Sequence, residues 1–328
     1  MKSISGLTNW RLTVRREPES VTILRARTCD KIAVLPEALF GLPVTMLSDR
    51  ALAPAPAPAE GEEVRILGGA ESEDWDNRNI TDLTLPRALL HIGDYAFMNL
   101  RAMETLRFSD ELEEIGSAGF MNCRAFSKIE LQRTGLRQGP ALAAIARALS
   151  QELDVTVCNP DGSVLRLIFP EYIENYTENS PAHHFELKIS GGGYAYHGVF
   201  REKALAVSDY DALWRGYLAA EHDEQSALRL AYYRLRWPSE LADRARDGYA
   251  AYLRRRLGDA LSFALRERDA EGLRLLLGLG DCPDEILDAA LREAREARDT
   301  EATALLLEKR HSGPAAGGSK NMNYSLPL

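Results

Sequence analysis

Residues 80–125 read ITDLTLPRALLHIGDYAFMNLRA and then METLRFSDELEEIGSAGFMNCRA, two stretches of 23 residues that align without a gap. Apolar, glycine and asparagine positions recur in register between them. The matched positions are Leu83 with Leu106, Leu85 with Phe108, Leu89 with Leu112, Ile92 with Ile115, Gly93 with Gly116, and Phe97-Met98-Asn99 with Phe120-Met121-Asn122. A third copy begins at Phe126, keeps Ile129 and Leu131 in register, and then stops. A repeat at a fixed period of this length predicts a stacked, repetitive fold.

Each copy predicts one turn of a solenoid. The alternating pair Leu83 and Leu85 is typical of a short strand with one buried face, and the spacing from Leu89 to Ile92 indicates a helical segment. Phe97 is expected on the inner spine. Gly93 is expected to adopt a backbone conformation closed to residues with a Cβ, and Asn99 to hydrogen-bond backbone groups of the next turn.

This pattern carries the pairs Leu85-Pro86, Ile92-Gly93, Ala96-Phe97 and Asn122-Cys123. With these residues it resembles the BspA-like leucine-rich repeat family over roughly residues 20–133. Residues 32–52, IAVLPEALFGLPVTMLSDRAL, resemble the degenerate first copy of such arrays, with Leu47-Ser48 in place of the expected Ile-Gly. The Pro-Ala alternation of residues 53–63 predicts an extended loop on the solenoid edge.

A second repeat predicts helices. ERDAEGLRLLLGLG from Glu267 and ARDTEATALLLEKR from Ala297 align at a 30-residue offset, and Asp269 and Asp299 are expected to cap the helices that follow them. Helix pairs at this period resemble ankyrin-type stacking, without the Thr-Pro-Leu-His signature of that family.

The stretch between the two repeats predicts a mixed segment. We expect a helix at 141–152, a β-hairpin around the turn 159–162, and strands at 185–189 and 194–200 separated by Gly191-Gly192-Gly193. The predicted fold class is an α+β repeat protein: a short leucine-rich solenoid, an α/β cap, and an ankyrin-like helical array. The predicted segments are a leucine-rich domain at 1–139 with a loop insertion at 53–79, a cap or linking segment at 140–202, a helical repeat domain at 203–311 and a flexible tail at 312–328.

Composition narrows the location and the class of ligand. The net charge of −9 argues against a general nucleic-acid binder, and neither an export signal nor an apolar run long enough for a membrane span is evident. A cytoplasmic location is therefore expected. The isolated cysteines Cys29, Cys123, Cys158 and Cys282 are expected to be reduced and mostly buried.

Residues that suggest chemistry have simpler structural interpretations. His183 and His184 are neighbours on an extended segment and are expected to point to opposite faces, so they do not form a metal site by themselves. Gly191-Gly192-Gly193 lacks the lysine of a phosphate loop and is interpreted as a turn. The acidic run 71–76 lacks the ligand spacing of a calcium loop and is interpreted as a solvated loop. Arg254-Arg255-Arg256 does not form one helix face. Tyr232-Tyr233 and Trp237 are expected to pack in the core. No catalytic, cofactor-binding or metal-binding residue is predicted, and no cofactor.

Two repeat arrays predict extended binding surfaces. The expected function is a non-enzymatic intracellular scaffold or adaptor with protein partners and no nucleic-acid or membrane partner. A further resemblance to bacterial cytoplasmic leucine-rich proteins that accompany MoxR-type ATPases implies an adaptor role in such a system. The alternatives are a ligand-binding or enzymatic protein with its site in 140–202, and a surface adhesin. In the tail, alternating Tyr324, Leu326 and Leu328 suggest a peptide that docks on a sheet edge of a partner or of a second copy.

Overall fold

The computed structural model describes residues 2–5, 7–56, 60–69, 74–135, 140–179 and 184–312. The chain forms two compact units, Met1–Arg246 and Asp247–Leu328. The strands are β1 Lys2–Ser5, β2 Trp10–Arg16, β3 Val21–Arg27, β4 Ile32–Val34, β5 Ala38–Leu39, β6 Leu42–Leu47, β7 Glu62–Leu67, β8 Asp82–Thr84, β9 His91–Ile92, β10 Thr105–Ser109, β11 Glu114–Ile115, β12 Lys128–Gln132, β13 Leu153–Cys158, β14 Val164–Phe169, β15 Ile173–Asn179, β16 His184–Ser190, β17 Phe200–Arg201 and β18 Ala204–Leu205. The helices are α1 Ala141–Ala148, α2 Val207–Ala212, α3 Trp214–Ala219, α4 Glu224–Arg236, α5 Asp243–Arg255, α6 Leu257–Arg266, α7 Ala270–Gly278, α8 Asp284–Glu296 and α9 Thr300–Ser312, with 3₁₀ turns η1 Asn77–Asn79 and η2 Tyr194–Gly198.

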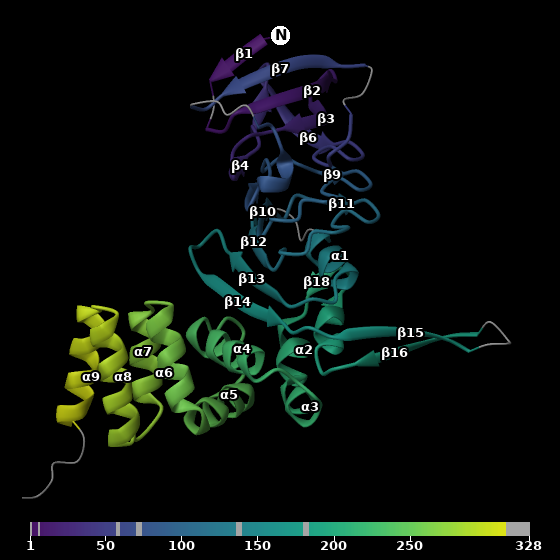
Figure 1. Cartoon of the computed structure of the whole chain (residues 1–328). Helices are drawn as coiled ribbons and strands as arrows, with labels where there is room; N and C mark the ends of the chain where they lie inside the picture. Colours follow the sequence, from purple (N-terminus) through teal and green to yellow (C-terminus); the bar gives the residue numbers. More distant parts are fainter. Residues whose placement is uncertain are drawn as a thin grey trace, which may run out of the picture. The chain divides into compact units, whose positions relative to one another are not determined.

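The first unit is built on a β-solenoid, as the 23-residue repeat predicts. One side of it is a six-stranded sheet in the order β14-β13-β12-β10-β8-β4, whose strands lie one above another in Figure 1. All pairs except β13–β14 are parallel. Leu83 lies opposite Leu106, and Leu106 opposite Ile129, so the register of the sequence alignment is the register of the sheet.

The second sheet runs in the order β1-β7-β2-β3-β6-β9-β11, with β5 beside β6. Here the expectation of a helical segment from Leu89 to Ile92 was wrong. Leu89 lies in a turn, its N–H bonded to the Pro86 carbonyl, and Ile92 lies in the short strand β9, which pairs with β6 and β11. A corner turn brings residues three apart onto one side just as a helix does, so spacing alone does not separate the two.

The degenerate first copy forms a full turn despite its altered sequence. Leu47 pairs with Ile92, and its carbonyl accepts a hydrogen bond from the Gly93 N–H. Asp49 Oδ1 accepts a hydrogen bond of 2.8 Å from the Asp94 N–H. Leu47-Ser48 therefore forms the solenoid turn at the position where the sequence pattern of the other copies has Ile-Gly.

Residues 53–79 are not simply a loop, because Glu62–Leu67 forms β7. This strand pairs with both β2 and β1 inside the second sheet. The buried Asn77 then fastens the end of the insertion: its amide donates to the carbonyls of Ala26 and Leu52, and its Oδ1 accepts from the Thr28 N–H. The partners of β7 are distant in sequence, so local alternation did not reveal them.

Gly93 and Gly116 are required by close stacking, and not by a special backbone conformation. Neither has a positive φ. A Cβ on Gly93 would lie 2.5 Å from the Asp49 nitrogen, and one on Gly116 would lie 2.5 Å from the Asp94 nitrogen. The backbone of one turn thus passes directly against the turn before it.

We expect Gly116→Ala to destabilise the first unit by about 1–3 kcal/mol, because the added methyl group pushes two turns apart. Gly119→Ala is the matched control: its Cβ would have no neighbour closer than 3.4 Å, and the equivalent residue of the previous turn is Ala96. Chemical denaturation followed by tryptophan fluorescence measures both. Equal midpoints for the two variants would show that the stacking distance is not the constraint.

Asn99 and Asn122 form a ladder between turns. Both adopt positive φ, 67° and 62°, a conformation that asparagine tolerates better than most residues. The Asn122 side-chain amide donates to Asn99 Oδ1 at 2.9 Å. The expected contact between turns is present, but it joins two side chains, whereas a bond to the backbone was predicted.

The stretch after the solenoid extends the sheet. The predicted hairpin is confirmed as β13 and β14, and β13 adds in parallel to β12. Two expectations were wrong: α1 ends at Ala148, four residues before Glu152, and residues 194–198 form η2 where a strand was expected. Strand β16 instead pairs with β15, which the sequence pattern did not indicate.

The second unit contains the predicted helical repeat. Asp269 and Asp299 each cap a helix by accepting a hydrogen bond of 3.0 Å from the N–H three residues ahead. Arg268 and Arg298 precede them with φ of 52° and 54°, so the two turns share one geometry at the 30-residue offset. Helices α6–α7 and α8–α9 form two hairpins that pack on each other through α6 with α8 and α7 with α9. The ankyrin likeness stays a prediction.

Candidate functional site

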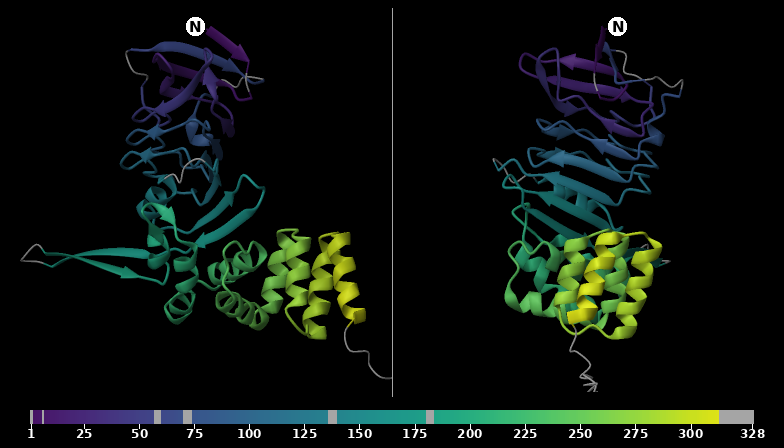
Figure 2. Two further views of the ribbon diagram at one scale, coloured as in Figure 1. Left: turned by 180° about the vertical axis from the view of Figure 1, so that it is seen from behind. Right: turned by 90° about the vertical axis from the view of Figure 1, so that its left-hand side faces the viewer.

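A two-stranded hairpin projects from the first unit. Strands β15 and β16, which we call the hairpin arm, form a sheet of their own and extend away from the solenoid in Figure 1 and in the left view of Figure 2. Tyr176 and Leu187 lie opposite each other in this sheet and therefore share a face. They are 66% and 47% exposed. Large apolar side chains gathered on an exposed surface mark a site of interaction.

The other face of the hairpin arm is polar except at its base, where Ile173 lies opposite Ser190 and is 54% exposed. Asn175 lies opposite Lys188, and Thr177 lies opposite Glu186, whose carbonyl accepts a hydrogen bond from the threonine hydroxyl. The two faces of the hairpin arm thus differ at these positions, because successive side chains of a strand point to opposite faces.

The base of the arm is held firmly. Tyr172 is buried and packs edge-on against Tyr194 and His197, with ring centroids 5.1 and 5.0 Å away. The two ring nitrogens of His197 lie 2.7 Å from the Ala146 carbonyl oxygen and 2.8 Å from that of Pro170. These contacts tie the root of the arm to α1 and to the end of β14.

The outward side of the six-stranded sheet carries paired charges. The Arg107 guanidinium donates to Glu130 at 2.7 and 3.0 Å and to Asp82 at 3.2 Å, which joins three adjacent strands. The hydrogen bonds to Glu130 raise the pKa of Arg107. Nearby, Arg166 donates to Asp154 at 2.9 Å. This polar face offers fixed charges of both signs.

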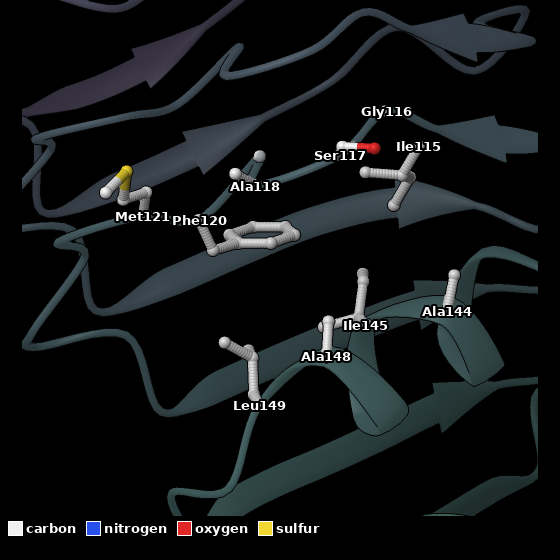
Figure 3. A pocket seen from close by; sticks show the side chains of 11 residues that line it. Ile115, Gly116, Ser117, Ala118, Phe120, Met121, Ala144, Ile145, Ala148 and Leu149 are labelled. Atoms are coloured by element: carbon white, nitrogen blue, oxygen red, sulfur yellow. The ribbon is translucent and has the colours of Figure 1, made fainter. Parts of the chain in front are cut away.

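A cleft lies where the solenoid ends. It has a volume of about 410 Å³ between the last complete turn and α1, and Figure 3 shows Phe120 and Met121 on one side and Ile145 and Leu149 on the other. Apart from Ser117, the side chains that line it are apolar, and backbone atoms supply the rest of its polar surface. The alternative of a ligand or enzyme site in 140–202 calls for converging polar groups, which this cleft does not supply.

Comparison with known protein families identifies the type of repeat in the solenoid. Residues 71–139 match the family described as the BspA type leucine-rich repeat region, with 6 copies. This region is a BspA-type leucine-rich repeat. No curated protein matches the chain. Leucine-rich repeat regions of this type generally serve in protein interaction or belong to surface proteins.

Two solved structures resemble parts of the chain. A leucine-rich cell surface protein from Faecalibacterium prausnitzii has 15% identity and a TM-score of 0.26, with 48% of this chain and 42% of that chain covered. The leucine-rich repeat protein of T. pallidum has 20% identity and a TM-score of 0.21, with 37% of this chain and 68% of that chain covered. This chain thus spans less than half of the Faecalibacterium protein.

Two groups of residues discussed in the sequence analysis have the structural roles that were predicted for them. Tyr232 and Tyr233 are buried, as predicted, and Trp237 packs edge-on against Tyr233 at 5.5 Å. Gly191-Gly192-Gly193 is a turn, as interpreted, and a Cβ on Gly193 would lie 2.2 Å from the Pro170 oxygen.

Several residues named in the sequence analysis lie outside the part of the chain that the structure describes. His183, residues 71–73 of the acidic run and the tail residues Tyr324, Leu326 and Leu328 lie outside the described residues. Within the described ranges, no three His, Cys, Asp or Glu side chains gather into a metal-binding group. In the same ranges, no helix combines the length and the hydropathy that crossing a bilayer requires.

The cysteines are free but less buried than expected. Only Cys123 is fully buried, and burial raises the pKa of its thiol to about 12, so it is a poor nucleophile. Cys29, Cys158 and Cys282 are half-buried.

Sequence reasoning found one strand of the hairpin arm and missed the other: the strand expected at 185–189 lies within β16, whereas β15 was not expected. Residues 173–179 read IENYTEN, in which neither alternate set of side chains is consistently apolar, so no period-2 pattern marked this strand.

Proposed function

We propose that this chain is a non-enzymatic adaptor that binds a protein partner through the apolar face of the hairpin arm. The observation that carries the proposal is the exposed pair Tyr176 and Leu187 on a sheet of only two strands. An isolated two-stranded hairpin is marginally stable in water and gains stability when a third element covers it. A partner surface that buries this face supplies such cover.

The chemistry of the face defines the partner. A tyrosine ring and a leucine side by side require an apolar surface, with a polar group within reach of the phenol hydroxyl. Glu174 on the same face adds a negative charge at the edge. The paired charges around Arg107 on the leucine-rich repeat offer a second, polar contact surface, as extended repeat surfaces do.

We further propose that the adaptor works in the cytoplasm and that a MoxR-type ATPase system is the first partner to test. In this proposal the leucine-rich domain at 1–139 and the helical repeat domain at 203–311 each present a binding surface, and the segment 140–202 links them and carries the hairpin arm. The exposed face of the arm and the family match of residues 71–139 support the binding of a protein partner. The cytoplasmic location and the MoxR-type system follow from the sequence pattern and its resemblance alone.

We expect the double variant Tyr176→Glu, Leu187→Lys to lose partner binding by roughly 30-fold or more, because buried aromatic anchors typically contribute over 2 kcal/mol. The measurement is quantitative copurification from the native host, followed by titration with the purified partner. The unfolding midpoint should not change, since both side chains are exposed.

The double variant Asn175→Glu, Thr177→Lys, on the opposite face of the same arm, is the matched control and should retain the partner. If both double variants retained every partner, the arm would not be the binding element. If both lost the same partners equally, the contact would not depend on the apolar face.

A further inference from the structure

The outer face of strands β7, β2 and β3, which lie near the N-terminus in Figure 1, carries a row of arginines. Arg27 on β3 lies opposite Arg11 on β2, and Arg11 lies opposite Arg65 on β7. Successive side chains of a strand point to opposite faces, and the alternate residues Leu12 and Ala26 are buried in the core, so the arginines face outward. Like charges directly opposite each other destabilise a sheet. A negatively charged group near this row would relieve the repulsion.

Arg25 lies on the same face, two residues before Arg27. It is 9% exposed, and neither its Nε nor its Nη1 atom has a hydrogen-bond partner among the residues that the structure describes. Burial lowers the pKa of Arg25, and the neighbouring charges of Arg27 and Arg50 lower it further. A guanidinium nevertheless keeps its charge at neutral pH. Arg25 is thus a buried cation beside two like charges.

The two flanking arginines are exposed, and the contacts that they make are with uncharged groups. The Arg27 guanidinium donates to the Ala55 carbonyl oxygen at 2.9 Å. The Arg50 guanidinium lies over the Tyr95 ring, with 5.4 Å between its Cζ atom and the ring centroid. An anion can therefore reach both side chains from solvent.

Two carboxylates near this face are not partners of Arg25. Hydrogen bonds from Arg78 lower the pKa of Asp76, and the charge of Arg27 lowers it further, so Asp76 is already paired. Glu63 shares the face of Arg25 but lies opposite Thr13, two strands away at about 10 Å. A buried charge without a counter-charge is costly. An external anion beside Arg25 would therefore stabilise the fold.

We propose that Arg25, Arg27 and Arg50 form a binding site for a phosphate group, separate from the hairpin arm. Guanidinium groups match the oxygen atoms of phosphate through paired, charge-assisted hydrogen bonds. A phosphate dianion offsets two of the three positive charges, whereas a carboxylate offsets only one. Arg27 and Arg50 contact the phosphate from the surface, and Arg25 contributes a charge that has no hydrogen-bonded partner in the described residues.

Arg25→Met tests the unpaired charge, because it keeps the apolar stem and removes the guanidinium. Without phosphate, this variant should unfold at a higher temperature than the parent. At a phosphate concentration about ten times the dissociation constant, the midpoint of the parent should rise by about 3–5 °C, and that of the variant should not. Tryptophan fluorescence reports the unfolding, since all the tryptophans lie in this unit.

Arg50→Met tests binding without a buried substitution. Arg50 is exposed, so the variant should fold like the parent. Its dissociation constant for inorganic phosphate, measured by titration calorimetry, should rise about tenfold for the loss of one charge-assisted hydrogen bond. Arg15→Met is the matched control. Arg15 is an exposed residue of β2 that pairs with Glu17 at 2.9 Å, and its variant should bind phosphate like the parent.

Two phosphate probes distinguish the source of the ligand. Inorganic phosphate and O-phosphoserine are each titrated into the parent, with acetate at equal ionic strength for comparison. Binding of inorganic phosphate alone would support a site for the free ion, and comparable or tighter binding of O-phosphoserine would support a site for a phosphorylated molecule. Acetate binding as tight as that of phosphate would overturn the choice of ligand.

The site itself is overturned by either of two results. One is a parent chain that does not bind phosphate. The other is an equal response to phosphate in the parent, Arg25→Met and Arg50→Met, since a general salt effect acts on all variants alike.

Discussion

Phe97→Ala is expected to destabilise the first unit by about 3–5 kcal/mol, the usual cost of truncating a buried phenylalanine. Phe97 is fully buried, and its ring packs against Phe120, with centroids 5.3 Å apart. Phe120 in turn stacks on Phe126 at 4.8 Å. Removing Phe97 therefore leaves a cavity in the spine that joins consecutive turns.

Tryptophan fluorescence measures this loss selectively, because Trp10, Trp75, Trp214 and Trp237 all lie in the first unit. The midpoint of thermal unfolding should fall by on the order of 10 °C. Phe120→Ala should also destabilise, whereas Arg101→Ala, an exposed residue of the same repeat, is the control. If the unfolding midpoints of Phe97→Ala and Arg101→Ala lay within a degree of each other, the stabilising role assigned to Phe97 in the spine would be wrong.

The second large effect is expected at the buried ion pair between Asp211 on α2 and Arg234 on α4. Their side chains are 6% and 0% exposed, and two hydrogen bonds of 2.8 and 2.9 Å join them. Arg234 also donates to the Ser239 carbonyl at 3.0 Å. Asp211→Ala leaves the guanidinium buried without its carboxylate, which typically costs about 3–5 kcal/mol.

Asp209 provides a control on the same helix. It pairs with Arg201 at 2.6 Å, but on the surface, where water screens the interaction. Asp209→Ala should leave the midpoint of chemical unfolding unchanged, while Asp211→Ala lowers it. The double variant Asp211→Leu, Arg234→Met should recover much of the stability, because it removes both charges together. No recovery would show that the loss in Asp211→Ala comes from packing and not from an unpaired charge.

Features that recur at short range along the chain could be predicted from the amino-acid sequence. The 23-residue period specified the sheet register, because identical turns stack with identical positions above one another. It also identified Phe97 as a spine residue. In the helical unit, Asp269 and Asp299 were recognisable as caps, because a cap depends only on the three or four residues that follow it.

The pairing of distant segments became evident from the three-dimensional fold. Strand β7 joins the second sheet and β15 pairs with β16 through hydrogen bonds that any extended segment can make, so local alternation did not select the partner. The need for glycine at Gly93 arises from the approach of another turn, and not from its own dihedral angles. The exposure of Tyr176 and Leu187 likewise depends on what fails to pack against them. Such long-range contacts are absent from local periodicity, which is why the candidate binding face emerged from the fold.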